Sequence, residues 1–231
     1  MRRSRLAWLL AVLLPGVLGP MLGGCGQATL SPSSEASFSA RDRQLLAHAP
    51  YAQATIAETY RRHMVDYSRK EAPGTILVDT DARYLYYVLP RGKAIRYGVA
   101  VGEEAMAFSG VAVVGRMAEW PDWIPTREIQ ERLGPYPARV AGGAANPLGA
   151  RALYLYEDNK DTLYRIHGTN QPEYIGASIS SGCIRLTNED AIDLYNRVKI
   201  GTIVVVLEPH HGDSPFNSQM ALQGGSQAFM Q

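Results

Sequence analysis

The apolar positions of the chain change character near residue 73. Beyond it, β-branched and aromatic residues fall in short runs separated by Gly, Pro, Asp and Asn. The runs occupy residues 75–80, 84–89, 94–102, 110–116, 152–157, 164–168 and 202–208. Runs of this length and composition are typical of strands, and helical crossovers are missing between most of them. The pattern therefore predicts a mainly β fold, a sandwich or a barrel, rather than a parallel α/β sheet.

Helical patterns occur in two places. In residues 43–72 the apolar positions recur at imperfect helical spacing, which predicts one or two short helices before the β region. These positions are Leu45, Leu46, Tyr51, Ile56 and Tyr60. The second helix follows Cys183, where Thr187 is a candidate N-cap, acidic residues occupy the first turn, and Gly201 ends the segment.

Two further segments show neither the strand pattern nor the helical spacing. Residues 118–151 contain Trp120, Trp123 and many Pro, Gly and Asn residues, a composition too irregular for a sheet core. We expect a long loop that forms a wall or lid of a functional site. Residues 209–231 are polar and aperiodic, which predicts a disordered tail.

The N-terminal residues have the composition of an export signal. Three arginines precede an apolar run over residues 6–14 that is too short to span a bilayer, so residues 1–24 are interpreted as a signal peptide. The stretch Leu22-Gly23-Gly24-Cys25 resembles the lipobox of bacterial lipoproteins, in which the cysteine receives a diacylglycerol. Residues 25–42 are rich in small and polar residues and predict a flexible tether. We expect a periplasmic protein held on a membrane through Cys25; a plain secretory signal is the alternative.

Composition narrows the classes of partner. Removal of residues 1–24 takes away three arginines and no acid, which changes the formal charge from +1 to −2. The basic residues form no dense stripe, so nucleic acid is not an expected partner. His48 and His63 lack partners at metal-ligand spacing, so neither a metal nor another cofactor is expected.

The chain contains two cysteines, Cys25 and Cys183. If Cys25 carries lipid, Cys183 is a lone thiol in a compartment that favours disulfides, which indicates a chemical role; a disulfide between the two is the alternative. His167 ends a predicted strand sixteen residues before Cys183. An imidazole that takes the proton of a thiol turns it into an acyl acceptor, so the pair predicts nucleophilic catalysis.

The residues around Cys183 suit that chemistry. Gly182 allows close approach of a substrate, and the amides of Gly182 and Cys183 could form an oxyanion hole. Ser180 and Ser181 keep the turn small and polar; we expect Ser181 to contribute backbone close to the oxyanion and Ser180 to contact the substrate. Arg185 is placed to hold a carboxylate with its fork of donors, although an ordinary surface ion pair is the alternative.

The stretch from His167 to residue 207, together with residues 146–155 and 74–88, resembles the L,D-transpeptidase catalytic domain, also called YkuD-like. The similarity covers residues 73–208. In this family a histidine is followed, after a spacer of this size, by Ser or Thr, a variable position that is often His, and Gly-Cys. His167, Ser180, Gly182 and Cys183 match that motif, and Ile184 and Arg185 continue it. Ser181 departs from it.

The resemblance implies a β-sandwich enzyme of bacterial peptidoglycan. Cys183 would attack the bond between the third residue of a stem tetrapeptide, typically diaminopimelate, and its terminal D-alanine, with His167 as base and the carbonyl of Gly168 orienting the imidazole. The thioester would pass to another stem, to a lipoprotein lysine or to a free D-amino acid. A sortase-like transpeptidase and a catalytically silent wall-binding lipoprotein are the alternatives.

Overall fold

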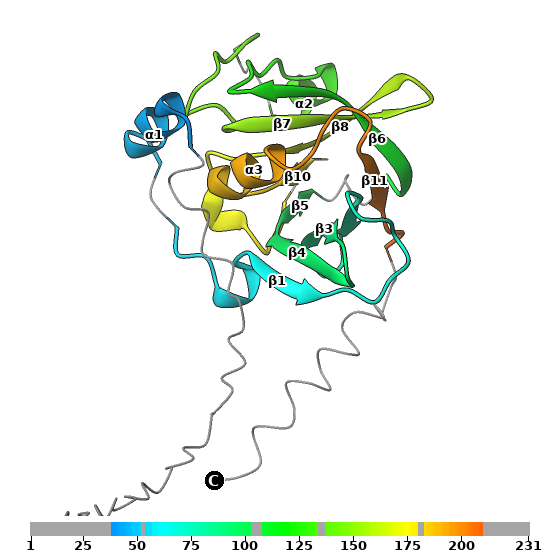
Figure 1. The fold of residues 1–231 in the computed structure, drawn as a ribbon. Coiled ribbons are helices and arrows are strands. Elements are labelled where there is room, and N and C mark those ends of the chain that lie inside the picture. Colours follow the sequence, from blue (N-terminus) through cyan, green and yellow to red (C-terminus); the bar gives the residue numbers. More distant parts are fainter. Residues whose placement is uncertain (1–37, 52–53, 103–107, 134–136, 180–182, 210–231) are drawn as a thin grey trace, which may run out of the picture.

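The computed structural model describes residues 38–209, apart from residues 52–53, 103–107, 134–136 and 180–182 (Figure 1). The helices are α1 (Ala40–Ala47), η2 (Glu58–Tyr60), α2 (Arg127–Leu133), η4 (Pro172–Tyr174) and α3 (Asn188–Tyr195). The strands are β1 (His63–Asp66), β2 (Ile76–Asp79), β3 (Tyr84–Leu89), β4 (Lys93–Gly98), β5 (Ala100–Gly102), β6 (Gly110–Glu119), β7 (Arg151–Glu157), β8 (Lys160–His167), β9 (Ser178–Ile179), β10 (Ile184–Arg185) and β11 (Ile203–Val206). The predicted mainly β fold is confirmed.

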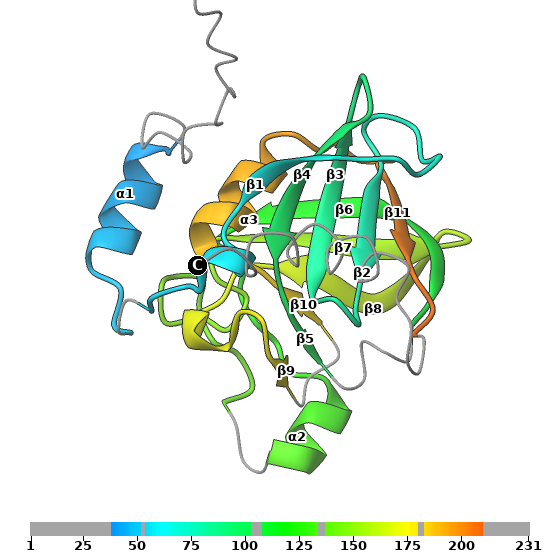
Figure 2. The ribbon, with the colours of Figure 1, turned by 90° about the horizontal axis from the view of Figure 1, so that it is seen from below.

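The strands of the described residues form one sheet in the order β1-β4-β3-β2-β11-β6-β7-β8-β10-β5-β9. The sheet folds back on itself, and Figure 2 shows β4, β3 and β2 running across β6, β7 and β8. Between the two halves lies the main core, to which β2, β4, β7 and β8 contribute Ile76, Tyr97, Leu155 and Ile166, each at most 1% exposed. Burial of such side chains is the main stabilising contribution to the fold.

A helix after Cys183 is confirmed and begins where the sequence predicts. The hydroxyl of Thr187 accepts a hydrogen bond from the amide of Asp190 at 3.1 Å, which caps α3. Ile192 of α3 is fully buried in a second cluster with Trp120 and Ala150. The helix is therefore fixed against the first residues of β7, close to the end of β8.

Two elements differ from the sequence predictions. His63–Asp66, expected within a helical segment, is strand β1, which pairs antiparallel with β4 through Met64 opposite Ile95. Four residues are too few to display a period, so the pairing with β4 decides the conformation. The segment expected to be a long irregular loop contains the helix Arg127–Leu133.

The end of the predicted tether is also wrong. Ser39 and Asp42 form a reciprocal capping box at the start of α1, and Asp42 is only 1% exposed. Phe38, Leu45 and Leu46 pack against the cluster around Trp120. Residues 38–42 are thus part of the folded unit, because their apolar and acidic side chains have partners far along the chain.

Candidate active site

Strands β8 and β10 bring the chemically active residues together. The two strands are parallel, with Ile184 opposite Ile166 and Arg185 opposite His167. Ile166 and Ile184 point into the main core at 1% and 2% exposure. Side chains alternate along a strand, so His167 and Arg185 lie on the other face of the sheet. Cys183 directly precedes β10 and interacts electrostatically with Arg185.

His167 is buried, and one of its ring nitrogens is fixed. Nδ1 lies 2.5 Å from the carbonyl oxygen of Gly168. A carbonyl only accepts, so Nδ1 carries the hydrogen and donates it, which leaves the lone pair of the neutral ring on Nε2. Burial, followed by the positive charges of Arg185 and Arg165, lowers the pKa of His167 to about 3, although the bond to Gly168 opposes this. The imidazole is therefore neutral near pH 7.

Cys183 is half-buried and has no disulfide to another described residue. Arg185 is its charged neighbour: burial lowers the pKa of the guanidinium, and interaction with Cys183 acts in the opposite direction. Nη1 of Arg185 donates to Oε1 of Gln171 at 3.2 Å, and the next amide, of Leu186, donates to the carbonyl of His167 at 2.8 Å. The cation is thus held between the sulfur and the loop that follows His167.

Asn188, the first residue of α3, fixes the loop that orients His167. Its Oδ1 accepts from the amide of Ala150 at 2.8 Å, and its Nδ2 donates to the carbonyl of Thr169 at 2.9 Å and to the hydroxyl of Tyr51 at 2.7 Å. A Cβ on Gly168 would lie 2.2 Å from Oδ1 of Asn188. Gly168 is therefore required beside His167, because any side chain would displace this amide.

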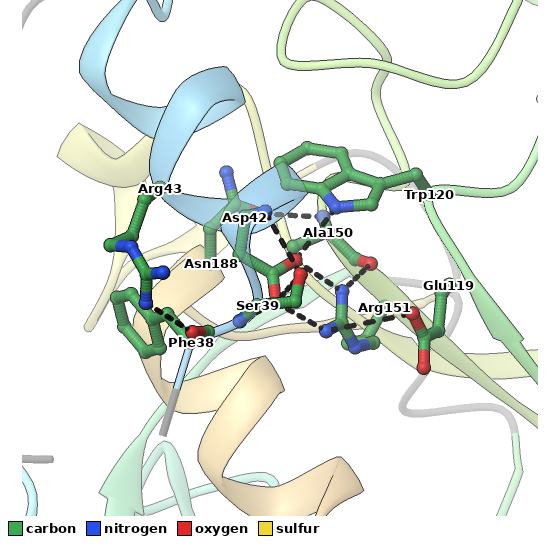
Figure 3. Close-up of polar contacts among 9 residues, drawn as sticks. All are labelled: Phe38, Ser39, Asp42, Arg43, Glu119, Trp120, Ala150, Arg151 and Asn188. Atoms are coloured by element: carbon green, nitrogen blue, oxygen red, sulfur yellow. Dashed lines mark hydrogen bonds and ion pairs between the residues drawn. The ribbon is translucent and has the colours of Figure 1, made fainter. Parts of the chain in front are cut away.

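A buried ion pair supports the same loop from the side of α1. Figure 3 shows Asp42 of α1 between Trp120 and Arg151, with Ala150 and Asn188 next to them. Both carboxylate oxygens of Asp42 accept from Arg151, at 2.8 and 2.9 Å, and Oδ1 also accepts from Nε1 of Trp120 at 2.8 Å. The carbonyl of Arg151 in turn accepts from the amide of Gly168 at 3.0 Å.

The structure thus brings His167, Gly168, Cys183 and Arg185 together. Ser180, Ser181, Gly182 and Cys25 lie outside the described residues. Within the described ranges no cluster of three or more His, Cys, Asp or Glu side chains could hold a metal. No described helix is long and apolar enough to cross a membrane.

Sequence reasoning missed Asn188 and the pair Asp42 and Arg151. Asn188 lies directly after the N-cap of α3, where its side-chain amide has no capping role. An asparagine at that position was the one local indication that its side chain binds elsewhere. The ion pair joins residues 109 positions apart and has no local signal.

A neutral buried histidine, opposite an arginine that interacts with a cysteine, supplies the residue types that acyl transfer through a cysteine requires. The family model for the L,D-transpeptidase catalytic domain, YkuD, matches residues 73–206. This chain belongs to that family.

Relatives named as L,D-transpeptidases match more than half of the chain. "Probable L,D-transpeptidase ErfK/SrfK" of Escherichia coli K12 is 35% identical over 140 residues, covering 58% of this chain and 44% of the relative. "Probable L,D-transpeptidase YbiS" of the same strain is 32% identical over 141 residues, with the same coverage. The match thus spans less than half of these relatives.

A solved structure from Brucella melitensis, titled as a probable carnitine operon oxidoreductase, is 48% identical and covers 66% of this chain and 96% of its own, with a TM-score of 0.46. A crystal structure of Enterococcus faecium L,D-transpeptidase, a C442S mutant, is 21% identical, covers 58% of this chain and 49% of its own, and has a TM-score of 0.42.

Proposed function

We propose that the protein is an L,D-transpeptidase that acts on peptidoglycan stem peptides, with Cys183 as nucleophile and His167 as general base. The observation that carries the proposal is the state of His167: its imidazole is neutral, its Nδ1 is bonded to the carbonyl of Gly168, and it lies opposite Arg185, which interacts with Cys183. Membership of the family supports the choice of substrate.

The first half-reaction releases D-alanine. Nε2 of His167 takes the thiol proton as the sulfur of Cys183 attacks the carbonyl carbon between diaminopimelate and D-alanine. The carbonyl electrons move to oxygen, and the tetrahedral oxyanion is stabilised by backbone amides, for which we propose those of Gly182 and Cys183. The oxyanion then collapses, the carbon–nitrogen bond breaks, and the departing amine takes the proton from the imidazolium. A thioester on Cys183 remains.

The second half-reaction regenerates the thiol. An acceptor amine attacks the thioester carbonyl, gives its proton to His167, and expels the sulfur, which recovers that proton. A stem amine would give a 3,3 cross-link, a lipoprotein lysine an anchored lipoprotein, and a free D-amino acid an exchanged stem. Arg185 would hold the terminal carboxylate of the D-alanine, and Ser180 and Ser181 would line the turn.

We place this reaction in the periplasm. Residues 1–24 have the composition of a signal peptide, and Cys25 follows a lipobox-like stretch, so the mature chain would be held on a membrane by lipid. Two acyl chains suffice for stable anchoring.

The test is D-alanine release from a tetrapeptide stem. We expect Cys183→Ala to abolish release, and His167→Ala to reduce kcat/KM by at least ~10²-fold, the usual scale for loss of a general base. A carbapenem should add once to the wild-type chain and not to the Cys183→Ala variant in intact-mass spectra. Full release by the Cys183→Ala variant would overturn the mechanism. A wild-type chain that binds stems without releasing D-alanine would be the silent wall-binding protein.

A further inference from the structure

A row of side chains from three neighbouring strands crosses the face of the sheet that carries His167. On β6, β7 and β8 the paired positions are Arg116 opposite Tyr154, and Tyr154 opposite Arg165. Arg165 lies two residues before His167, so both point to the same face. Ile184 lies opposite Ile166, and Cys183 and Arg165 directly precede these two paired residues on the two parallel chains. The row therefore begins beside the nucleophile and extends away from it.

Tyr154 lies between the two cations of this row. The guanidinium carbon of Arg116 is 4.5 Å from the centre of the Tyr154 ring, and that of Arg165 is 4.4 Å from it. Such stacking fixes the plane of a guanidinium and leaves its edge available for hydrogen bonds. Tyr154 is 8% exposed, since the arginines cover it.

The two arginines differ in what they bind. Nη1 and Nη2 of Arg165 donate to the two carboxylate oxygens of Asp161 at 2.6 and 2.8 Å, and Nη1 also donates to the carbonyl of Tyr164. Arg116 is exposed, and within the described ranges its recorded interaction is the stacking on Tyr154. Arg116 is thus an oriented cation whose donors face solvent, on the sheet face that carries His167.

We propose that Arg116, held over Tyr154, binds the second carboxylate of the acyl-donor diaminopimelyl residue. This rests on the proposed function, because it takes the other carboxyl of that residue to be the acyl group transferred to Cys183. Diaminopimelate is a dicarboxylic acid, so one carboxylate stays free when the other forms the scissile bond. A planar guanidinium matches that group with two parallel hydrogen bonds.

The dimensions agree. Arg116 belongs to β6, three strands from the line of β10, and its guanidinium stacks on Tyr154 of β7, two strands from that line. At a strand spacing of about 4.8 Å the guanidinium therefore lies about 10–14 Å from the line of β10. Six carbon–carbon bonds of about 1.5 Å join the two carboxyl carbons of diaminopimelate, a span of roughly 8 Å. A hydrogen bond of about 2.9 Å extends this reach to about 11 Å, which falls within that interval. Arg185 and Arg116 would then hold the two free carboxylates of the donor on different sides of Cys183.

The test compares two tetrapeptide stems that differ in one group, a free or an amidated second carboxyl on diaminopimelate. Their dissociation constants are measured on the Cys183→Ala variant, so that no turnover intervenes. We expect the free carboxylate to bind roughly tenfold tighter at low salt, a preference that shrinks at high salt because the pair is exposed. Adding Arg116→Gln should reduce the ratio of the two dissociation constants, amidated over free stem, to about one. Arg116→Lys, which keeps the charge without the planar fork, should leave an intermediate ratio.

Arg61→Gln is the matched control. Arg61 is also an exposed arginine, paired with Glu58 at 3.0 Å. Its replacement by glutamine removes the same charge from the protein without changing any residue of the row. The control should keep the tenfold ratio. Equal affinities for the two stems in the Cys183→Ala parent, a ratio that survives Arg116→Gln, or no binding of either stem would each overturn the inference.

D-alanine release by the chain with Cys183 intact separates the two proposals. If the chain prefers the free carboxylate but does not release D-alanine, the proposed transpeptidase activity is wrong and the proposed carboxylate subsite stands. If the chain releases D-alanine but binds both stems equally, the proposed activity stands and the proposed subsite is wrong.

Discussion

Replacing Asp42 by alanine should destabilise the whole domain, although Asp42 lies more than a hundred residues from its main partner. The carboxylate is 1% exposed and its partner Arg151 is 4% exposed in its side chain. Asp42 accepts hydrogen bonds from both Nη atoms of Arg151, from Nε1 of Trp120, and from the amide and hydroxyl of Ser39. Removal of the acid leaves the buried guanidinium with one recorded anionic partner, Glu119, which is 53% exposed and lies 3.9 Å from Nη2.

The magnitude follows from that burial. Breaking a buried ion pair by removing one partner costs about 3–5 kcal/mol, because the remaining charge is uncompensated. For a domain of this size 1 kcal/mol corresponds to roughly 2–4 °C in Tm, so Asp42→Ala should lower Tm by about 6–20 °C. Burial alone would raise the pKa of Asp42, but bonds from Arg151 and Ser39 outweigh it and hold the pKa at about 2. The stabilisation from this acid is complete above pH 3.8 and lost as pH falls towards 2.

The assay is urea unfolding of the wild-type chain, Asp42→Ala, Arg151→Met and the double variant. The double variant should be more stable than Asp42→Ala, because it no longer buries a guanidinium that has lost its main anion. Asp66→Ala is the matched control: it breaks an ion pair with Lys93 whose acid is 91% exposed, and should leave the unfolding free energy nearly unchanged. An Asp42→Ala variant as stable as Asp66→Ala would refute the reasoning.

Three further predictions concern titration and positioning. Because the pKa of His167 is low, kcat/KM should not fall through protonation of its imidazole between pH 7.5 and 5. A histidine with the ordinary pKa of 6.5 would lose about thirty-fold in kcat/KM at pH 5. A fall in kcat/KM centred near pH 6.5 would contradict this prediction. Asn188→Ala leaves an amide and a carbonyl buried without partners, which should cost about 2–4 kcal/mol in urea unfolding and at least ~10-fold in kcat/KM; unchanged kinetics would remove its positioning role. Burial raises the pKa of Asp190 from 3.8 to about 7, so stability from its proton is complete below 3.8 and lost as pH rises to 7. Asp190→Asn should therefore gain stability relative to wild type over that interval, and a constant difference would count against it.

Local patterns in the sequence were sufficient for the longer strands and for the start of α3. The run at residues 84–89 coincides with β3, because its aromatic and β-branched side chains fit a pleated sheet wherever they are buried. Thr187 was recognisable as an N-cap because a cap depends on a residue and the amide three positions later. His167 and Cys183 could be singled out from motif and spacing, and the sheet pairs His167 with Arg185, two residues after Cys183.

Elements fixed by distant partners were not predictable. β9 and β10 are two residues each, too short for any period, and exist because β5 and β8 offer them a hydrogen-bonding edge. The acid of α1 looked like part of a polar tether, since its cation follows 109 residues later. Burial of that pair, and not helix propensity, makes residues 38–42 part of the domain.

The support of His167, the proposed general base, explains why these distant contacts bear on the proposed function. Gly168 is held through its amide by the carbonyl of Arg151, and the next carbonyl, of Thr169, by Asn188. Arg151 is fixed by α1 and Asn188 belongs to α3, so three separate parts of the chain determine where the carbonyl of Gly168 points. That carbonyl decides which nitrogen of His167 carries the hydrogen. A weakened α1 contact should therefore affect the orientation of the base as well as the stability of the fold.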